Sequence, residues 1–203
     1  MKKHLQIILG ILLVSVASLA SAQTNANETV KRIVKSFRDK KNVELRFDYQ
    51  YVVDANNQSD VQQGTAYLQG EAYKIILKEQ QTISDGTTIW SYLVDDEEVM
   101  VSNTTDGSDN TPLKLLTTLD KGYKATFTDN STIMLTNPDG QYKVVSLSID
   151  PKNNTLVGME IHADDGSKMV ILITEMKFDQ NLKANFFTFD EKAFPNVDII
   201  DMR

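Results

Sequence analysis

The sequence contains no cysteine. Its absence excludes disulfide bonds, a thiolate nucleophile and a cysteine-bound metal. It also excludes a lipid attached to an N-terminal cysteine, so the chain is not expected to be a lipoprotein itself. Histidine is almost absent too, because His4 lies in an N-terminal leader and only His162 remains. A single histidine is a poor basis for a metal centre or a catalytic triad, and we predict no metal, no cofactor and no enzymatic activity.

The chain has one long hydrophobic run, and it lies at the N-terminus. Lys2 and Lys3 precede the run, which spans 5–19, and Ala20-Ser21-Ala22 has the small-x-small pattern of a signal peptidase site. The run is short for a membrane span. We therefore predict a signal peptide over 1–22, cleaved after Ala22, and an exported domain over 23–203. A bacterial periplasm is the expected location, with secretion into the medium as the alternative.

Basic residues are outnumbered by acidic ones. The formal net charge of −7 becomes −9 when the two lysines of the leader are removed. A basic footprint for nucleic acid is therefore missing, and an acidic surface disfavours anionic lipid headgroups. The length after the leader suits one domain that buries about 70% of its unfolded surface. We expect a monomer that binds no nucleic acid.

Two short helices are predicted from apolar stripes. In the segment 24–40 one face carries residues at helical spacing: Val30, Ile33, Val34 and Phe37. The second helix is predicted to start with Thr111 as N-cap and Pro112 at the first helical position, and to end by Gly122. Its apolar residues are Leu113, Leu115, Leu116 and Leu119.

The remaining segments alternate between apolar and polar residues, as strands do. Over 43–53, one face carries Leu45, Phe47, Tyr49 and Tyr51, and the other face is polar, which indicates a half-buried strand. Further strands are predicted over 61–69, 72–78, the two arms of a hairpin within 82–93, 97–103, 124–128, 132–136, 142–149, 156–163, 169–178 and 186–189. This spacing predicts an α+β fold with one large antiparallel sheet, curled or closed.

The hairpin within 82–93 is the most informative strand pair. Asp85-Gly86 favours a tight turn, because glycine adopts a positive φ without strain. In the second arm, Trp90 and Tyr92 share one face, and Ile89 and Ser91 share the other. Both faces are thus largely apolar. Either another part of the chain covers the second face, which is the simpler interpretation, or that face is kept for an apolar guest.

These segments, in their order, resemble a known family, the LolA-type outer-membrane lipoprotein carriers. The stretch 84–90, SDGTTIW, is similar to the family's S-D-G-x-x-[LI]-W signature. Tyr73-Lys74-Ile75 resembles the strand before it, Asn110-Thr111-Pro112 the family's N-x-P helix entry, and Phe187-Thr188-Phe189 its closing F-x-F strand. The resemblance covers essentially the whole chain after the leader.

The resemblance implies an incomplete β-barrel with the two helices as a lid. Such carriers take a lipoprotein from an inner-membrane ABC-type transporter, shield its acyl chains across the periplasm and pass it to an outer-membrane acceptor. Well-known members carry an arginine in the third strand that is thought to latch the lid. The matching stretch 64–71 has none, which leaves both the latch and the identity of the acceptor open.

Any carrier of acyl chains has to shield hydrocarbon from water. Burial of an acyl chain gains about 0.8 kcal/mol per methylene, so a carrier needs a large apolar interior and no covalent chemistry. Methionines in strands, such as Met159 and Met169, suit an adaptable lining. We expect lipoprotein acyl chains to bind between the helices and the sheet, against Ile33, Val34, Phe37, Phe47, Tyr49, Tyr73, Ile75, Trp90, Tyr92, Leu113, Leu116 and Leu119.

Two other functions are considered. The chain could bind another lipid or apolar ligand, which the same pattern fits equally well. An envelope hydrolase would need catalytic groups such as His162, or Glu160 paired with Glu175, but no hydrolase motif is present. The acidic segment 95–98 lies in a predicted hairpin turn and is interpreted as solvated. The segment 106–110 lacks the spaced ligands and the distal glutamate of a calcium loop, and it is interpreted as a turn before the second helix.

Overall fold

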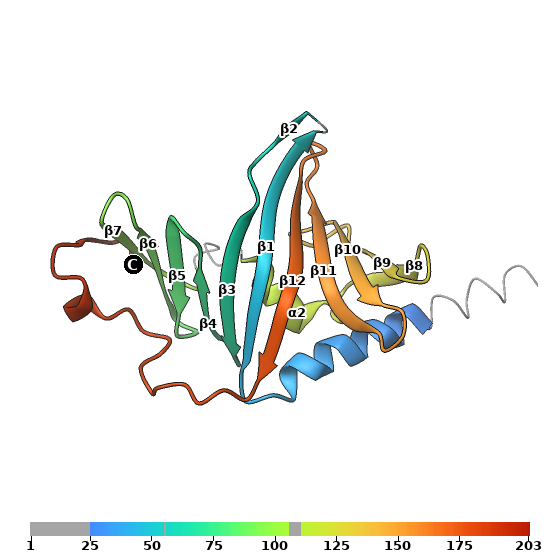
Figure 1. Ribbon diagram of the computed structural model, residues 1–203, viewed down its shortest axis with the longest axis horizontal. Helices are drawn as coiled ribbons and strands as arrows, with labels where there is room; N and C mark the ends of the chain where they lie inside the picture. The colour runs from blue at the N-terminus through green and yellow to red at the C-terminus, as the bar shows by residue number, and fades with distance from the viewer. Residues whose placement is uncertain (1–24, 55, 106–110) are drawn as a thin grey trace, which may run out of the picture.

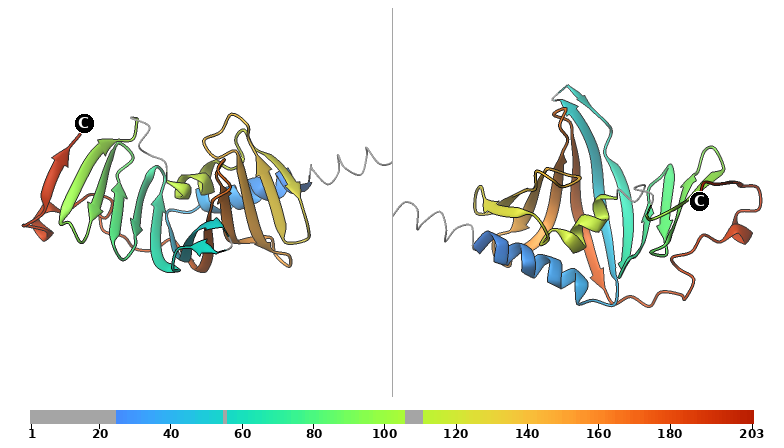
Figure 2. Two further views of the ribbon diagram at one scale, coloured as in Figure 1. Left: turned by 90° about the horizontal axis from the view of Figure 1, so that it is seen from above. Right: turned by 180° about the vertical axis from the view of Figure 1, so that it is seen from behind.

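The structure, a computed structural model, describes residues 25–54, 56–105 and 111–203. In these residues a large curled sheet wraps around two helices, both of which lie on its concave face (Figures 1 and 2). The predicted signal peptide and the acidic segment 106–110, including Asn110 of the helix-entry motif, lie outside the described residues. No helix in the described ranges combines the length and the apolar character needed to cross a bilayer.

Thirteen strands of the described chain form a single sheet in the order β13-β7-β6-β5-β4-β3-β1-β12-β11-β10-β9-β8, with β2 paired to β1. All pairings are antiparallel except that of β13 with β7. The strands are β1 Val43–Asp54, β2 Asn57–Gln58, β3 Gln62–Gln69, β4 Ala72–Ile76, β5 Gln80–Ser84, β6 Thr88–Leu93, β7 Glu98–Asn103, β8 Lys124–Phe127, β9 Thr132–Thr136, β10 Val144–Asp150, β11 Thr155–His162, β12 Lys168–Phe178 and β13 Asp198–Asp201.

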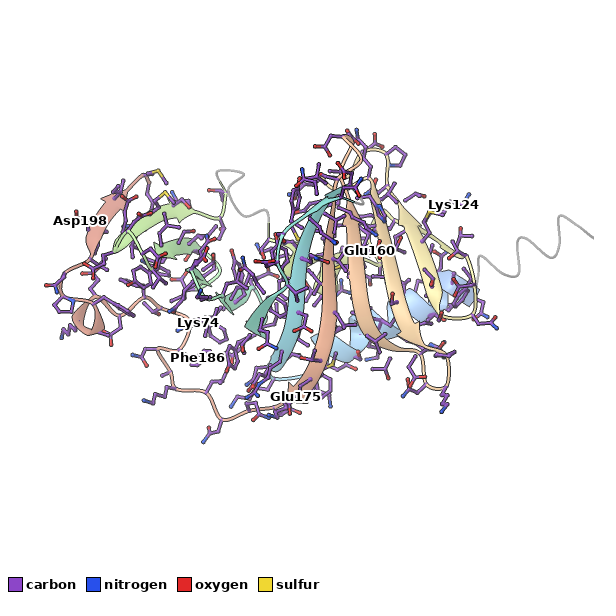
Figure 3. The ribbon with its side chains drawn as sticks, turned by 45° about the horizontal axis from the view of Figure 1, so that its top comes forward. Lys74, Lys124, Glu160, Glu175, Phe186 and Asp198 are labelled. Carbon is purple, nitrogen blue, oxygen red and sulfur yellow. The ribbon has the colours of Figure 1, made fainter. Side chains whose placement is uncertain are left out.

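The sheet is curled but not closed, because its two ends, β8 and β13, have no mutual pairing. Figure 3 marks these ends with Lys124 and Asp198, on opposite sides of the molecule. Register shifts at Arg46/Phe47 in the β1–β12 pair and at Ser148/Ile149 in the β10–β11 pair add local bends. The predicted curled antiparallel sheet with two helices is confirmed.

The helices form where their apolar stripes predict. The N-terminal helix covers residues 25–38 of the described chain, and α2 covers Pro112–Thr118. Thr111 caps α2 as expected, since its side-chain oxygen accepts a hydrogen bond from the Leu113 amide at 3.4 Å. The helix stripes and the concave side of β1, β3, β4 and β8–β11 form the main core.

Asn42 joins the N-terminal helix to the residues that follow β12. Its side chain is buried, its Oδ1 accepts a hydrogen bond from the Gln180 amide, and its Nδ2 donates to the Gln180 carbonyl, at 2.8 and 2.9 Å. The Asp179 amide donates to the Asn42 carbonyl at 3.0 Å. The turn between the helix and β1 is thereby fixed to the point where β12 ends and the C-terminal segment begins.

The C-terminal segment crosses the convex face of the sheet. Phe186 packs edge-on against Tyr67, with ring centroids 4.8 Å apart, and the Lys74 ammonium lies 5.4 Å from the Phe186 ring (Figure 3). Partial burial lowers the pKa of Lys74. Further along, Phe189 and Phe194 stack and enclose Tyr92. A second, smaller core therefore lies on the convex side of β5–β7.

The predicted last strand, 186–189, is wrong. Residues 184–188 form turns, in which the Phe186 amide bonds the Lys183 carbonyl and the Thr188 amide bonds the Asn185 carbonyl. The alternating phenylalanines reflect packing against the sheet and not pairing with it. The true final strand is β13, which follows the turn at 191–193 and runs parallel to β7.

We predict that Asn42→Ala destabilises the protein by about 2–4 kcal/mol, because it empties a buried site and leaves the half-buried backbone groups of Gln180 without partners. Chemical denaturation measures this loss. Asn130→Ala, at an exposed turn, is the matched control and should change the free energy of unfolding by less than about 0.5 kcal/mol. Equal effects of the two substitutions would contradict the role assigned to Asn42.

Candidate functional site

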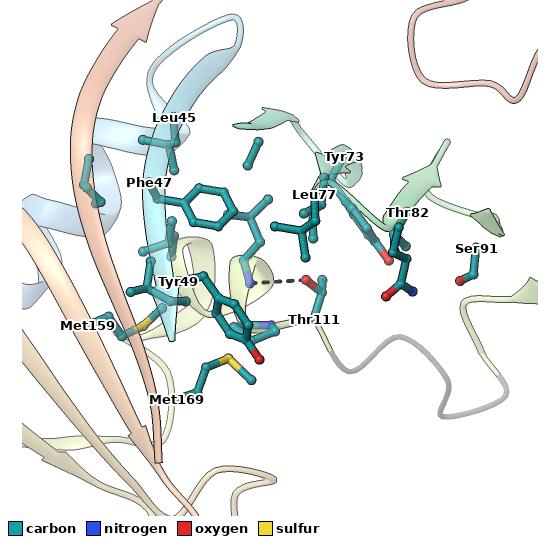
Figure 4. Close-up of a pocket in the computed structure, with 18 of the residues that line it drawn as sticks. Leu45, Phe47, Tyr49, Tyr73, Leu77, Thr82, Ser91, Thr111, Met159 and Met169 are labelled. Atoms are coloured by element: carbon teal, nitrogen blue, oxygen red, sulfur yellow. Dashed lines mark hydrogen bonds between the residues drawn. The ribbon is translucent and has the colours of Figure 1, made fainter. Parts of the chain in front are cut away.

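A cavity of about 400 Å³ lies between α2 and the concave face of the sheet (Figure 4). Its volume falls within the range of about 300–1,000 Å³ typical of small-molecule sites. The lining residues are Leu45, Phe47, Tyr49, Ala66, Tyr73, Ile75, Leu77, Gln80, Thr82, Ile89, Ser91, Thr111, Pro112, Leu113, Leu116, Leu156, Met159, Met169, Ile171 and Ile173.

None of these described lining residues carries a charge. Burial raises the pKa of Tyr49, with a smaller contribution from Tyr51, so the Tyr49 phenol stays neutral at physiological pH. In the described ranges no group of acidic residues or histidines is arranged to hold a metal ion. The cavity is therefore suited to an apolar or weakly polar guest and not to an ion.

The structure brings half of the predicted site residues together in the cavity wall: Phe47, Tyr49, Tyr73, Ile75, Leu113 and Leu116. The other helix residues, Ile33, Val34, Phe37 and Leu119, are buried in the main core next to it. They hold the helices on the sheet but do not line the cavity in this conformation. The N-terminal helix thus packs closely, and the space lies beneath α2.

Trp90 and Tyr92 were expected in the cavity, but the structure places them on the opposite face of β6. Both belong to the smaller core, where the C-terminal segment covers them. Ile89 and Ser91 line the cavity in their place. Since side chains alternate along a strand, the choice of face depends on which covering segment reaches which side. One face of the hairpin is thus covered by another part of the chain, and the other face lines the cavity.

Sequence reasoning missed the contribution of β11 and β12. Met159 of β11 and Met169, Ile171 and Ile173 of β12 line the cavity, although only the methionines had been considered as lining residues. The alternation of β12 carried a usable signal, because Ile171 and Ile173 share a face with Met169. What the alternation does not reveal is which face of β12 is concave.

The convex face carries the groups considered for catalysis. Ser146 Oγ lies 3.3 Å from His162 Nε2, and Glu160 Oε2 lies 3.9 Å from the same nitrogen. In a catalytic triad the serine and the acid bond different ring nitrogens, so this geometry is not a triad. Glu160 pairs with Val170, which places Glu175 about 16 Å along the neighbouring strand (Figure 3). That separation exceeds the spacing of glycosidase carboxylates, at most about 9.5 Å.

One glycine shapes the cavity wall. Gly64 pairs with Phe47 across β3 and β1. A Cβ atom at position 64 would lie 2.4 Å from Phe47 Cζ and 2.8 Å from Leu77 Cδ2. Phe47 and Leu77 thus occupy the space that a side chain at position 64 would need, and together they separate the cavity from a polar depression on the outer face.

Comparison with known proteins decides the family. A sequence model described as outer membrane lipoprotein carrier protein LolA matches residues 76–190, more than half of the chain. The chain belongs to the LolA family. No curated protein sequence matches the chain.

Solved structures of similar fold share little sequence with this chain. An uncharacterised conserved protein from Thermus thermophilus superposes with a TM-score of 0.55 at 10% identity, covering 87% of this chain and 99% of that one. A DUF1329 family protein from Desulfovibrio piger gives 0.50 at 10% identity, covering 85% and 99%. A LolA superfamily protein from Nitrosomonas europaea gives 0.47 at 11% identity, covering 81% and 97%.

The two helices are joined to each other by an arginine of the N-terminal helix. Arg38, at the end of the N-terminal helix, makes two hydrogen bonds of 2.8 Å to the Asp120 carboxylate. Its Nε donates to the Thr117 carbonyl at 2.9 Å, in the last turn of α2. A cation therefore satisfies the negative end of α2, which has no basic residue of its own there.

We predict that Gly64→Ala pushes Phe47 or Leu77 toward the cavity and lowers the free energy of unfolding by about 1–3 kcal/mol. Thermal unfolding measures the change. Adding Phe47→Leu should recover at least half of the loss, because the smaller side chain makes room. A Gly64→Ala protein as stable as the wild type would contradict the packing described.

We predict that Arg38→Ala loosens the two helices from one another more than it lowers overall stability. Hydrogen exchange of α2 amides should quicken by about fivefold, the equivalent of a partly exposed ion pair of about 1 kcal/mol. Lys31→Ala is the control, because it removes a 2.8 Å ion pair with Glu28 inside the N-terminal helix alone. The same exchange rates in both variants would show that Arg38 does not join the helices.

Proposed function

We propose that this protein is a periplasmic chaperone that holds the acyl chains of lipoproteins in its cavity and carries them from the inner to the outer membrane. The observation that carries the proposal is an uncharged cavity beneath a lid helix, in a chain of the LolA family. The signal peptide over 1–22 directs export, and the domain over 23–203 acts as a monomer by binding alone, without catalysis. Its cargo comes from an inner-membrane ABC-type transporter.

The size of the cavity sets how much lipid it holds. If a methylene takes about the volume of a water molecule, about 30 Å³, then 400 Å³ holds about 13 methylenes. Their burial is worth about 10 kcal/mol at about 0.8 kcal/mol each. Association costs about 4–15 kcal/mol, so the net affinity is modest. Modest affinity suits a carrier, which has to release its cargo.

A lipoprotein anchor with two or three chains needs more space than the described conformation offers. The helices cover the open side of the sheet, so their movement is the simplest way to enlarge the cavity. Arg38 and Asp120 couple the two helices, and we propose that they move as one lid. Ile33, Val34, Phe37 and Leu119 would then become acyl contacts, together with the residues that already line the cavity.

A second candidate function is the binding of another lipid or apolar ligand with a single chain. The volume of about one acyl chain favours it. Native mass spectrometry of protein extracted gently from the periplasm separates the two functions. A bound mass equal to a lipoprotein supports the carrier, and a bound mass equal to a free lipid supports the alternative.

We predict that Ile171→Trp lowers the affinity for an acylated peptide at least tenfold, because the indole occupies the cavity. The matched control is Leu172→Trp, one residue along β12 and exposed on the convex face. Titration of a fluorescent diacylated peptide measures both affinities. Unchanged binding by Ile171→Trp would place the acyl chains outside this cavity.

The same variants test transport. Wild-type protein added to spheroplasts should release labelled lipoproteins well above an unrelated periplasmic protein, Leu172→Trp should match it, and Ile171→Trp should not. His162→Ala should also match it, since a carrier needs no histidine. Release no greater than that given by the unrelated protein would exclude the carrier function.

A further inference from the structure

The cavity is not uniformly apolar, and three of its polar residues, Gln80, Thr82 and Ser91, lie on neighbouring strands. Thr82 of β5 and Ser91 of β6 are directly paired across the two strands and both face the cavity. Gln80 lies two residues before Thr82 on the same face. On the other side of the space, β11 and β12 contribute Met159 and Ile171 (Figure 4 labels Met159, Thr82 and Ser91). The lining thus changes from apolar to polar across the sheet.

The pairing register shows this change along one row of side chains. On the concave face, Leu45 pairs with Ala66, Ala66 with Ile75, Ile75 with Thr82, and Thr82 with Ser91. The row is apolar as far as Ile75 of β4, is polar at Thr82 and Ser91, and continues to Met100 of β7 outside the cavity lining. Paired side chains of this kind lie about 4.5–5.5 Å apart at Cβ, so the hydroxyls of Thr82 and Ser91 can reach one ligand group together.

These polar groups have free hydrogen-bonding capacity. Within 25–54, 56–105 and 111–203, no side-chain hydrogen bond of the protein uses Thr82 Oγ1, Ser91 Oγ or the Gln80 amide. Each of these side chains is half-buried. A partly buried polar group without a partner costs free energy that a suitable ligand atom recovers. Three such groups therefore favour a ligand with a polar atom at this place.

We propose that Gln80, Thr82 and Ser91 form a polar subsite for the uncharged linkage of an amphiphile, the ester or amide that joins its acyl chain to its headgroup. This inference rests on the proposed function. Hydroxyl and amide groups both donate and accept hydrogen bonds, which matches an ester or amide carbonyl. A phosphate would need a cation, and no described lining residue supplies one.

The subsite fixes the direction in which the guest lies. Its hydrocarbon extends toward Met159, Met169 and Ile171, and its linkage sits at β5 and β6. The headgroup, or the polypeptide of a lipoprotein, therefore leaves the cavity on the β5–β6 side. Ordinary hydrophobic burial alone would leave the direction of the chain unspecified, because it is non-directional.

The test compares two guests of similar length, methyl palmitate and heptadecane, which differ in the ester. Both compete with a fluorescent apolar dye bound in the cavity. The variant Thr82→Val/Ser91→Ala removes both hydroxyls and keeps shape and strand preference. We expect it to bind methyl palmitate about tenfold more weakly, the loss of one or two hydrogen bonds, and to bind heptadecane as the wild type does or more tightly.

The control variant is Thr126→Val/Ser148→Ala, which removes a hydroxyl from each of two strands outside the cavity lining. It should leave both affinities unchanged, and thermal unfolding verifies that both variants fold. Equal affinity of the subsite variant and the wild type for methyl palmitate, or equal losses for the two guests, would overturn the subsite. A wild type that binds neither guest would instead overturn acyl binding, and the subsite with it.

A second comparison identifies the source of the linkage. A diacylglyceryl-cysteine peptide and a dipalmitoyl phosphatidylethanolamine share the ester pair but differ in headgroup. The wild type should bind one of these two guests more tightly than the other. If Thr82→Val/Ser91→Ala loses affinity for that guest, the result supports the subsite and identifies its natural ligand class. No loss for either guest contradicts it.

Discussion

The structure depends on how the two helices pack on the concave face of the sheet. In the described chain, the concave face of a thirteen-stranded sheet is packed by two helices, the N-terminal helix over 25–38 and the seven-residue α2. Protein interiors are normally packed without voids larger than a water molecule, so space left under α2 is a departure from ordinary packing. The main core includes the stripe of the N-terminal helix, and the cavity lies between α2 and the adjoining part of the concave face.

The sequence alone predicted most positions of helices and strands, but not always which face of a strand points toward the cavity. Strong periodicity in 24–40 and 43–53, and the turn at Asp85-Gly86, depend on local chemistry and are readable from a single chain. The face on which Trp90 and Tyr92 lie could not be predicted, because both faces of β6 are largely apolar. Their face is determined by the C-terminal segment that covers it, about a hundred residues later in the chain. The cavity wall from β12 was missed for the same reason: alternation identifies two faces but does not say which is concave.

The contact between the two helices differs from the one that the family resemblance suggested. A family resemblance suggested a latch between a strand and the lid, and the stretch 64–71 offers no arginine for it. Here the charge is placed on the helix, where Arg38 meets the unsatisfied carbonyl of Thr117 and the carboxylate of Asp120. These contacts of Arg38 join the two helices to each other and do not involve the sheet. The Arg38–Asp120 ion pair therefore holds the two helices together independently of their packing against the sheet.

The final strand, β13, is held by its main chain and not by its side chains. β13 is attached to β7 through the main chain, with all four of its side chains exposed, and the amides of Asp198 and Met202 bond carbonyls of the β7 region at 2.9 Å. Backbone pairing asks little of residue type. The family match ends at residue 190, before this strand. Changes of these four exposed side chains should therefore leave β13 attached, because its main-chain pairing with β7 does not depend on them.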